Sequence, residues 1–179
     1  MTPNRQQAIY DAFPDLFRMA IDKTGLMAYG LCVDDGWFKL IWELSEAIMA
    51  ECHRLGLEPG KPGFPVAAQV KEKFGTLRFY LHPTTPPEPE YSESEVEDIR
   101  LGSGPGHDKM ERFDQMKGDL PERLESIYDL VREAGEFSQT ICERCGATGE
   151  MRQSGFWLRM RCEKCVEEEA KEQEEQSGR

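Results

Sequence analysis

Apolar residues recur with a helical period in the first third of the chain. Residues 5–24 carry apolar positions spaced three and four apart, with an interruption around Pro14, and this pattern predicts a broken N-terminal helix. A more regular stripe spans residues 37–52, so we expect a helix with one buried face there. Asp34 or Asp35 precedes that helix and can cap its first turn by accepting backbone N–H bonds.

The pattern changes to a period of two between residues 66 and 81. Apolar and polar positions alternate on both sides of residues 73–76, which predicts a β-hairpin with its turn at that point. A further helical stripe covers residues 124–137 and leads directly into a cysteine pair. Because a lone hairpin is marginal in water, the helices at 37–52 and 124–137 are its expected cover. The sequence therefore predicts an α+β fold, in which helices cover a small β-hairpin or sheet.

Residues 82–108 follow neither period. This stretch holds five prolines and three glycines, and we interpret it as a mobile acidic insertion with one helical turn near residues 94–100. Two interpretations remain open, a solvated insertion or a segment that binds a partner. Its candidate partner-binding carboxylates are Glu88, Glu90, Glu93 and Glu95.

The composition is that of an acidic globular chain. Its 179 residues include 22 Lys and Arg against 34 Asp and Glu, which gives a net charge of −12. This balance argues against binding duplex nucleic acid over a broad basic surface. No apolar run approaches the ~18 residues of a membrane span, and the N-terminus lacks the apolar core of a signal peptide. We therefore expect a cytoplasmic protein with no membrane partner.

Four of the six cysteines form two Cys-x-x-Cys pairs, Cys142 with Cys145 and Cys162 with Cys165, separated by 16 residues. In a reducing compartment this spacing predicts a metal site and not a disulfide framework. Zn²⁺ prefers four tetrahedral ligands, and four thiolates close its coordination sphere, so we expect a structural zinc. Gly146 and the helix-forming run after the second pair are typical of a treble-clef finger. An all-β zinc ribbon is the alternative fold, and iron–sulfur ligation or dithiol redox chemistry the alternative chemistry.

The predicted domain organisation has three parts. An α+β domain at residues 1–140 contains the acidic insertion at about 82–108. The Cys₄ zinc finger follows at 141–170, and 171–179 forms a frayed acidic tail.

A basic and aromatic pattern on the hairpin provides a second candidate surface. Lys71, Lys73 and Arg78 interleave with aromatic residues, an arrangement that can stack single-stranded bases or can simply deter strand pairing at a sheet edge. No Gly-x-Ser-x-Gly motif, phosphate-binding glycine loop or His-Glu-x-x-His motif is present. We therefore expect a protein that is not an enzyme.

Three stretches of the chain resemble a family of small bacteriophage and prophage proteins without a settled function. They are Gly-Trp-Phe-x-Leu-Ile-x-x-Leu at residues 36–44, Gln-Val-Lys-Glu-Lys-Phe-Gly-Thr-Leu-Arg-Phe-Tyr at 69–80, and Cys-x-x-Cys-Gly at 142–146. The resemblance covers roughly residues 30–82 and 122–165. It implies an intracellular, phage-encoded accessory protein that acts on host machinery or host defence, and it carries over no catalytic or ligand-binding residue.

The leading functional hypothesis is a non-enzymatic, zinc-stabilised binding protein that engages a host or phage protein. Its acidic segments at residues 88–98 and 167–175 suit a partner with a basic surface. The alternative is a nucleic-acid-binding regulator that uses the zinc finger together with the basic hairpin residues Lys71, Lys73 and Arg78.

Overall fold

The computed structural model describes residues 1–85, 89–154 and 157–177, with the side chains of residues 116–123, 154 and 176–177 excepted. Over these ranges the chain forms helices and two antiparallel two-stranded sheets, the α+β fold that the sequence predicts. No helix in the described part of the chain is long and apolar enough to cross a membrane. In chain order the elements are α1 (Pro3–Ala12), α2 (Arg18–Ile21), the 3₁₀ turns η1 (Gly25–Tyr29) and η2 (Asp35–Trp37), α3 (Phe38–Arg54), β1 (Pro65–Lys73), β2 (Thr76–Pro83), α4 (Glu93–Leu101), α5 (Pro105–Arg123), α6 (Glu125–Ser138), β3 (Glu150–Ser154), β4 (Trp157–Arg161) and α7 (Glu163–Ser177).

The first sheet is the hairpin that the alternating pattern predicts. β1 and β2 pair antiparallel, with Val70 opposite Phe79. Phe74 and Gly75 connect the strands with φ angles of 56° and 72°, the left-handed conformation required by the two-residue turn that matches the twist of a hairpin. On the other edge of β1, Cys32 forms a parallel bridge to Lys71. The hairpin therefore has one edge extended by the loop before α3.

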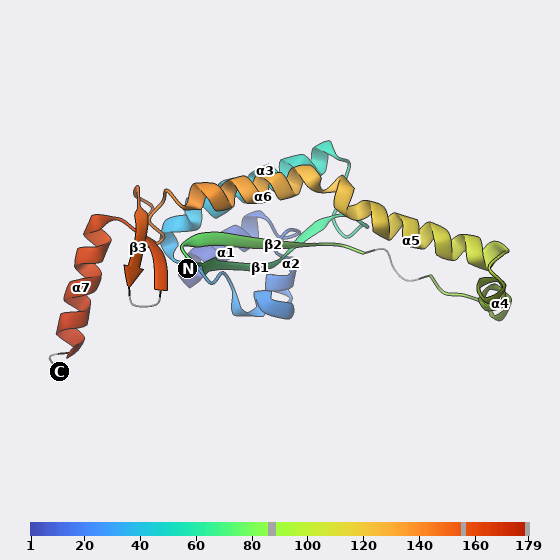
Figure 1. The fold of residues 1–179 in the computed structure, drawn as a ribbon, viewed down its shortest axis with the longest axis horizontal. Helices are drawn as coiled ribbons and strands as arrows, with labels where there is room; N and C mark the ends of the chain where they lie inside the picture. Colours follow the sequence, from blue (N-terminus) through green and yellow to red (C-terminus); the bar gives the residue numbers. More distant parts are fainter. Residues whose placement is uncertain (86–88, 155–156, 178–179) are drawn as a thin grey trace.

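One face of the hairpin joins the helices in a single hydrophobic core. Figure 1 shows α3 and α6 running together along one side of the hairpin, and the two helices are in direct contact. α6 also contacts β2, and α2 contacts β1. The helix at 124–137 therefore covers the hairpin as predicted, and the helix at 37–52 packs against α6 and joins the same core. The fully buried residues of this core include Ile9, Leu16, Phe17, Trp37, Ile41, Ile48, Ala67, Val70, Leu124 and Ile127.

The sequence predicts that Asp34 or Asp35 caps the following helix, and this prediction is wrong. α3 begins at Phe38, behind the short turn η2, and neither aspartate side chain caps η2 or α3. Asp34 Oδ2 instead lies 2.9 Å from the Arg161 guanidinium, and Asp35 Oδ1 accepts the backbone N–H of Thr2 at 2.6 Å. Both carboxylates are used in long-range contacts, because the 3₁₀ turn separates them from the first turn of α3.

The insertion predicted at residues 82–108 contains more helix than the single turn expected near residues 94–100. This stretch contains α4 and the start of α5, and the two helices project from the end of the body opposite to the second sheet (Figure 1). A capping box begins α4: the Glu95 N–H donates to the Ser92 side chain, while the Glu95 carboxylate accepts the Ser92 N–H. Gly102, in the left-handed conformation at φ 68°, follows the last residue of α4. These local signals produce a full helix, where composition alone suggested a single turn. We refer to α4 and α5 as the α4–α5 arm.

Candidate metal centre

The first cysteine pair lies in a tight turn just after α6. Ile141 and Thr148 bridge the base of the turn, and inside it the N–H of Gly146 donates to the carbonyl oxygen of Cys142 at 2.8 Å. Gly146 has a φ of 82°, a conformation that costs glycine little, so its position after Cys145 allows the chain to reverse. Residues 142–146 thus form a knuckle with both cysteines on one loop.

The second cysteine pair lies where the second hairpin, β3–β4, passes into α7. Cys162 directly precedes the helix, Cys165 lies in its first turn, and the Val166 N–H donates to the Cys162 carbonyl oxygen at 3.1 Å. A hydrogen bond from the backbone N–H of Cys165 lowers the pKa of the Cys162 thiol to about 7. The order of knuckle, hairpin and helix is that of a treble-clef finger, and the helix that carries the second pair distinguishes it from an all-β ribbon. The sequence predicts that Gly149 and Gly155 bracket a short hairpin between the two cysteine pairs, and Gly155 lies outside the described residues.

The four cysteine sulfurs converge. All lie within 4.8 Å of one another, and the Sγ atoms of Cys145 and Cys162 are 3.6 Å apart. A tetrahedral Zn²⁺ with Zn–S bonds of about 2.3 Å holds its sulfurs about 3.8 Å apart, so the donor set and the spacing fit this ion. Cys142 and Cys165 are buried, whereas Cys145 is exposed. The cluster could therefore hold a metal ion such as zinc through four thiolates.

The knuckle is clasped by the turn that precedes α3. The N–H of Gly36 donates to the carbonyl oxygen of Glu143 at 2.7 Å, and the buried Trp37 indole donates to the carbonyl oxygen of Ile141 at 3.1 Å. A Cβ atom at Gly36 would overlap the carbonyl oxygens of Cys142 and Glu143, so only glycine fits at this approach. The Gly-Trp pair, known from the sequence only as part of a motif, is therefore the body's contact with the knuckle.

Arg161 connects the finger to the body through a buried cluster of charges. Arg161 is only 3% exposed. Its guanidinium lies 2.9 Å from the Asp34 carboxylate, 3.2 Å from that of Glu143 and 2.7 Å from that of Glu169. These carboxylates come from the turn before α3, the knuckle and α7. One side chain thus joins three segments that are distant in the sequence.

The electrostatics of this cluster follow from its burial. Burial acts to lower the pKa of Arg161, but the hydrogen bond and charge of Glu169 and the charges of Glu143 and Asp34 raise it overall, so the guanidinium stays charged. Burial and the neighbouring Asp34 charge raise the pKa of Glu143 despite its bond to Arg161. Glu143 therefore depends on Arg161 as its nearest compensating charge.

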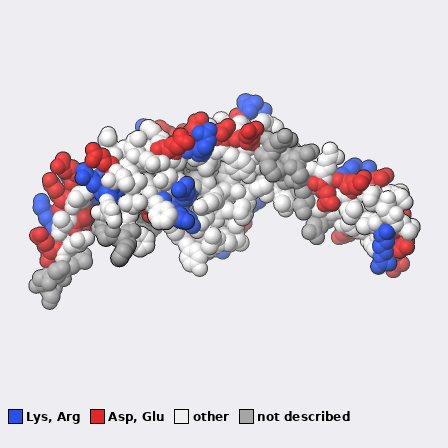
Figure 2. All heavy atoms as spheres, in the orientation of Figure 1, with Lys and Arg blue, Asp and Glu red and all other residues white. Residues whose placement is uncertain are grey.

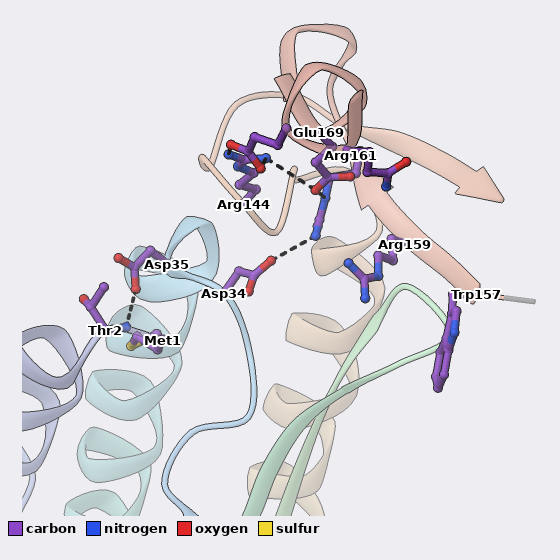
Figure 3. A pocket seen from close by; sticks show the side chains of 11 residues that line it. Met1, Thr2, Asp34, Asp35, Arg144, Trp157, Arg159, Arg161 and Glu169 are labelled. Carbon is purple, nitrogen blue, oxygen red and sulfur yellow. Dashed lines mark hydrogen bonds and ion pairs between the residues drawn. The ribbon is translucent and has the colours of Figure 1, made fainter. Parts of the chain in front are cut away.

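An open cleft lies between the finger and the N-terminal part of the body. It has a volume of about 720 Å³ and is lined by Asp34 and Asp35 from the body and by β4 and α7 from the finger. Figure 3 shows Arg161 reaching towards Asp34, with Arg159 beside it and Trp157 at the start of β4. Trp157 is 67% exposed. Most charged groups that line the cleft are paired with each other, so it serves as the seam between the two parts.

The finger uses most of its cations internally. Arg144 lies 2.6 Å from Glu172 and 3.7 Å from Glu169 on α7, while Arg152 lies 3.1 Å from Glu150. With Arg161 enclosed as described, these side chains present little uncompensated positive charge to a ligand.

The candidate partner-binding residues lie in two separate places. Lys71, Lys73 and Arg78 are together on the β1–β2 hairpin, where Lys71 stands directly opposite Arg78. Glu93 at the start of α4 and Glu90 just before it are exposed, whereas Glu88 lies outside the described residues. Glu95 is occupied by the Ser92 capping box and by Lys109 at 3.3 Å. The structure therefore does not bring the acidic and basic candidates into one site.

Asp34, Glu143, Arg161 and Glu169 were not identified as site residues from the sequence. No local pattern marks them, because each belongs to a different element and their contact arises only when the finger docks. Met160 and Arg161 are both buried at the end of β4, after three exposed residues. Two adjacent buried residues break the alternation of a strand, so the burial of Arg161 could not be predicted from a period of two.

The fold and the site together define an α+β protein with a treble-clef-like Cys₄ module docked on its body. Comparisons with models of known protein families, with curated proteins and with solved structures find no match.

Proposed function

We propose that the protein is a non-enzymatic binding protein, in which a structural Zn²⁺ held by Cys142, Cys145, Cys162 and Cys165 fixes α7 as an acidic docking element for a protein partner. The ion would neutralise part of the thiolate charge and connect the knuckle to the start of α7. A closed set of four sulfur ligands leaves no open coordination position for a substrate, which supports a structural ion over a catalytic one.

One observation carries this proposal: α7 is anchored on one face and acidic on the other. Glu169 and Glu172 point to Arg161 and Arg144 of the finger. Glu163, Glu167 and Glu174 fall on the opposite face at helical spacing, are exposed, and have no ion pair among the described residues. Anchoring fixes these three carboxylates in space, so they can complement a basic surface without a large ordering cost.

The resemblance of three sequence stretches to bacteriophage and prophage proteins supports a cellular setting for this binding. We therefore propose an accessory role in which the partner belongs to the host, for example an enzyme that acts on nucleic acid and whose basic surface α7 would cover. Figure 2 shows further acidic residues on the α4–α5 arm, at the other end of the molecule. Glu93 of α4 and Glu90 just before it could add a second contact to a large partner.

Affinity capture with a matched control tests the proposal. The variant E163Q/E167Q/E174Q removes the outer charges of α7, while E43Q/E46Q/E133Q removes three exposed charges from α3 and α6. Each protein is used to capture partners from a nuclease-treated bacterial lysate at low and at high salt. We expect a protein retained by the wild type and the control, lost by the α7 variant, and released by salt. Identical sets of captured proteins for all three chains would contradict the proposal.

A further inference from the structure

The outer face of the β1–β2 hairpin concentrates positive charge. Side chains alternate between the faces of a strand, so Lys71 and Lys73 of β1 lie on the same face as Arg78 and Tyr80 of β2, opposite the core residues. Lys71 is directly opposite Arg78, and Lys73 is the last residue of β1. This arrangement places three cations within a few residues of the turn.

None of these three cations has a carboxylate partner among the described residues. Among the described residues, most other Lys and Arg side chains are in ion pairs, as Arg144, Arg152 and Arg161 are in the finger. Lys71 and Lys73 contact aromatic rings instead: their Nζ atoms lie 5.5 Å from the Tyr80 ring and 5.3 Å from the Phe74 ring. In a chain of net charge −12, unpaired positive charge on one strand face is a local exception.

This face continues into a groove beside α6. The groove has a volume of about 430 Å³, with Arg78 and Tyr80 of β2 on one side and Tyr128 and Arg132 of α6 on the other. Gly135 brings the two elements close, since a Cβ there would lie 3.3 Å from the carbonyl oxygen of Leu77. The carboxylate of Glu136 also lines the groove, but it is paired with Arg132 of its own helix, as is Asp129, so neither is paired with Arg78.

Exposed aromatic rings accompany the charges. Phe74, Tyr80 and Tyr128 are all substantially exposed, at 60%, 44% and 38%. Such rings contribute little to folding in these positions but can stack on planar groups. Cations that alternate with exposed rings on a sheet face are the combination that binds single-stranded nucleic acid, because the cations contact phosphates while the rings stack on bases.

We propose that the outer face of the hairpin and its groove bind single-stranded nucleic acid, with Lys71, Lys73 and Arg78 on the phosphates and Tyr80 as a stacking platform. A duplex fits less well, because its bases are stacked inside and the exposed rings would have no partner. An acidic peptide would use the same cations but would gain less from the rings. This surface shares no residue with α7, so the proposal stands apart from the proposed protein partner.

Acidic residues lie near this surface as well as at a distance from it. In Figure 2 acidic residues gather over α7 and over the α4–α5 arm, at the two ends of the molecule, and also along the upper edge between them, with basic residues among them. On α6, beside the groove, Asp129 and Glu136 are paired with Arg132. The hairpin lies between α7 and the arm (Figure 1). Charges separated by more than a Debye length of about 8 Å are largely screened at physiological salt, so the local cations can dominate near the groove.

Fluorescence anisotropy with a labelled oligothymidine of about 20 nucleotides tests the proposal on the full metal-loaded chain. We expect micromolar binding at low salt that weakens as salt rises. Arg78→Gln should weaken binding and reduce the slope of log K against log salt by about 0.7, as expected for the loss of one phosphate contact. Tyr80→Ala should weaken binding at least about fivefold through lost stacking.

Conservative variants separate binding from a general effect on the fold. Tyr80→Phe keeps the ring and should bind like the wild type. Lys39→Gln removes an exposed cation from α3 and should change the affinity by less than about twofold. Thermal unfolding of each variant confirms that the hairpin is intact.

Three results would overturn the proposal. The first is no binding at about 100 µM protein, the weak end of non-specific nucleic-acid affinity. The second is equal affinity for a duplex of the same length, and the third is equal competition by polyglutamate combined with no effect of Tyr80→Ala. The last result would identify the face as a general polyanion or acidic-peptide surface.

Discussion

The finger and the α4–α5 arm lie at opposite ends of the molecule, and different interactions hold them in place. The finger depends on contacts between residues far apart in the sequence: four cysteines in two pairs, and Arg161 with carboxylates from three segments. The arm depends on neighbours in the chain, since α4 buries no residue and begins and ends with local caps. The finger and the arm are both acidic, but this shared charge does not show what orders each of them. They differ in how far apart in the sequence the contacting residues lie.

Metal removal should separate the two regions most strongly. A structural zinc supplies an apparent ~10–16 kcal/mol to the folding of its module, whereas the arm contributes no ligand to the cluster. We expect chelation to accelerate amide exchange by orders of magnitude at residues 142–166 and to leave α4 unchanged. Hydrogen exchange followed by mass spectrometry, with elemental analysis of the same samples, measures both.

Two cysteine variants provide the control for this experiment. Cys145→Ser should reproduce the effect of the chelator, while Cys32→Ser, which lies outside the cluster, should behave like the wild type. A finger that stays protected after elemental analysis shows complete metal loss would contradict the structural role of the ion.

The next largest effect is expected from Arg161→Met. This change keeps most of the side-chain volume but leaves the buried Glu143 without its compensating charge, so we expect a loss of about 3 kcal/mol in the free energy of unfolding. Urea unfolding gives this value as a lower midpoint at an unchanged m-value. The matched change Arg132→Met breaks only exposed ion pairs on α6 and should cost less than about 1 kcal/mol. Equal losses for both variants would show that the cluster does not fix the finger.

The smallest effect is expected in the arm. Ser92→Ala removes the side-chain acceptor of the capping box, so α4 should lose about 1 kcal/mol of local stability. Amide exchange at residues 93–101 should quicken, while exchange in the finger stays as it was. Ser92→Asn keeps a capping oxygen and should resemble the wild type. Equal rates of amide exchange in α4 for both variants would mean that contacts with α5, and not the cap, stabilise this helix.

Local patterns predicted the elements that are themselves local. The stripe at 37–52 became α3, the alternation around residues 73–76 became the hairpin with its turn at Phe74 and Gly75, and the spacing of the cysteines indicated the cluster. In each case the residues that form the pattern and the residues that form the element are close together in the sequence, on one helix face or in one turn.

The errors arose where a residue contacts a partner distant in the sequence, or where composition was weighed above a local capping signal. Asp34 looked like a helix cap because only its neighbours were considered, yet its partner is Arg161, 127 positions away. The extent of α4 was underestimated for the opposite reason. Its proline, glycine and glutamate content outweighed a capping box at Ser92 and Glu95 that was present in the sequence.

The close approach at Gly36 has a consequence for how such a chain can be divided or recombined. The backbone of the turn before α3 meets the backbone of the knuckle, and the Trp37 indole has its acceptor at Ile141. Cutting the chain at residue 140 would leave the hydrogen-bond donors on one fragment and their acceptors on the other. The body and the finger are therefore expected to be inherited as one unit, and a finger transplanted from an unrelated protein would need to bring its own Gly-Trp clasp.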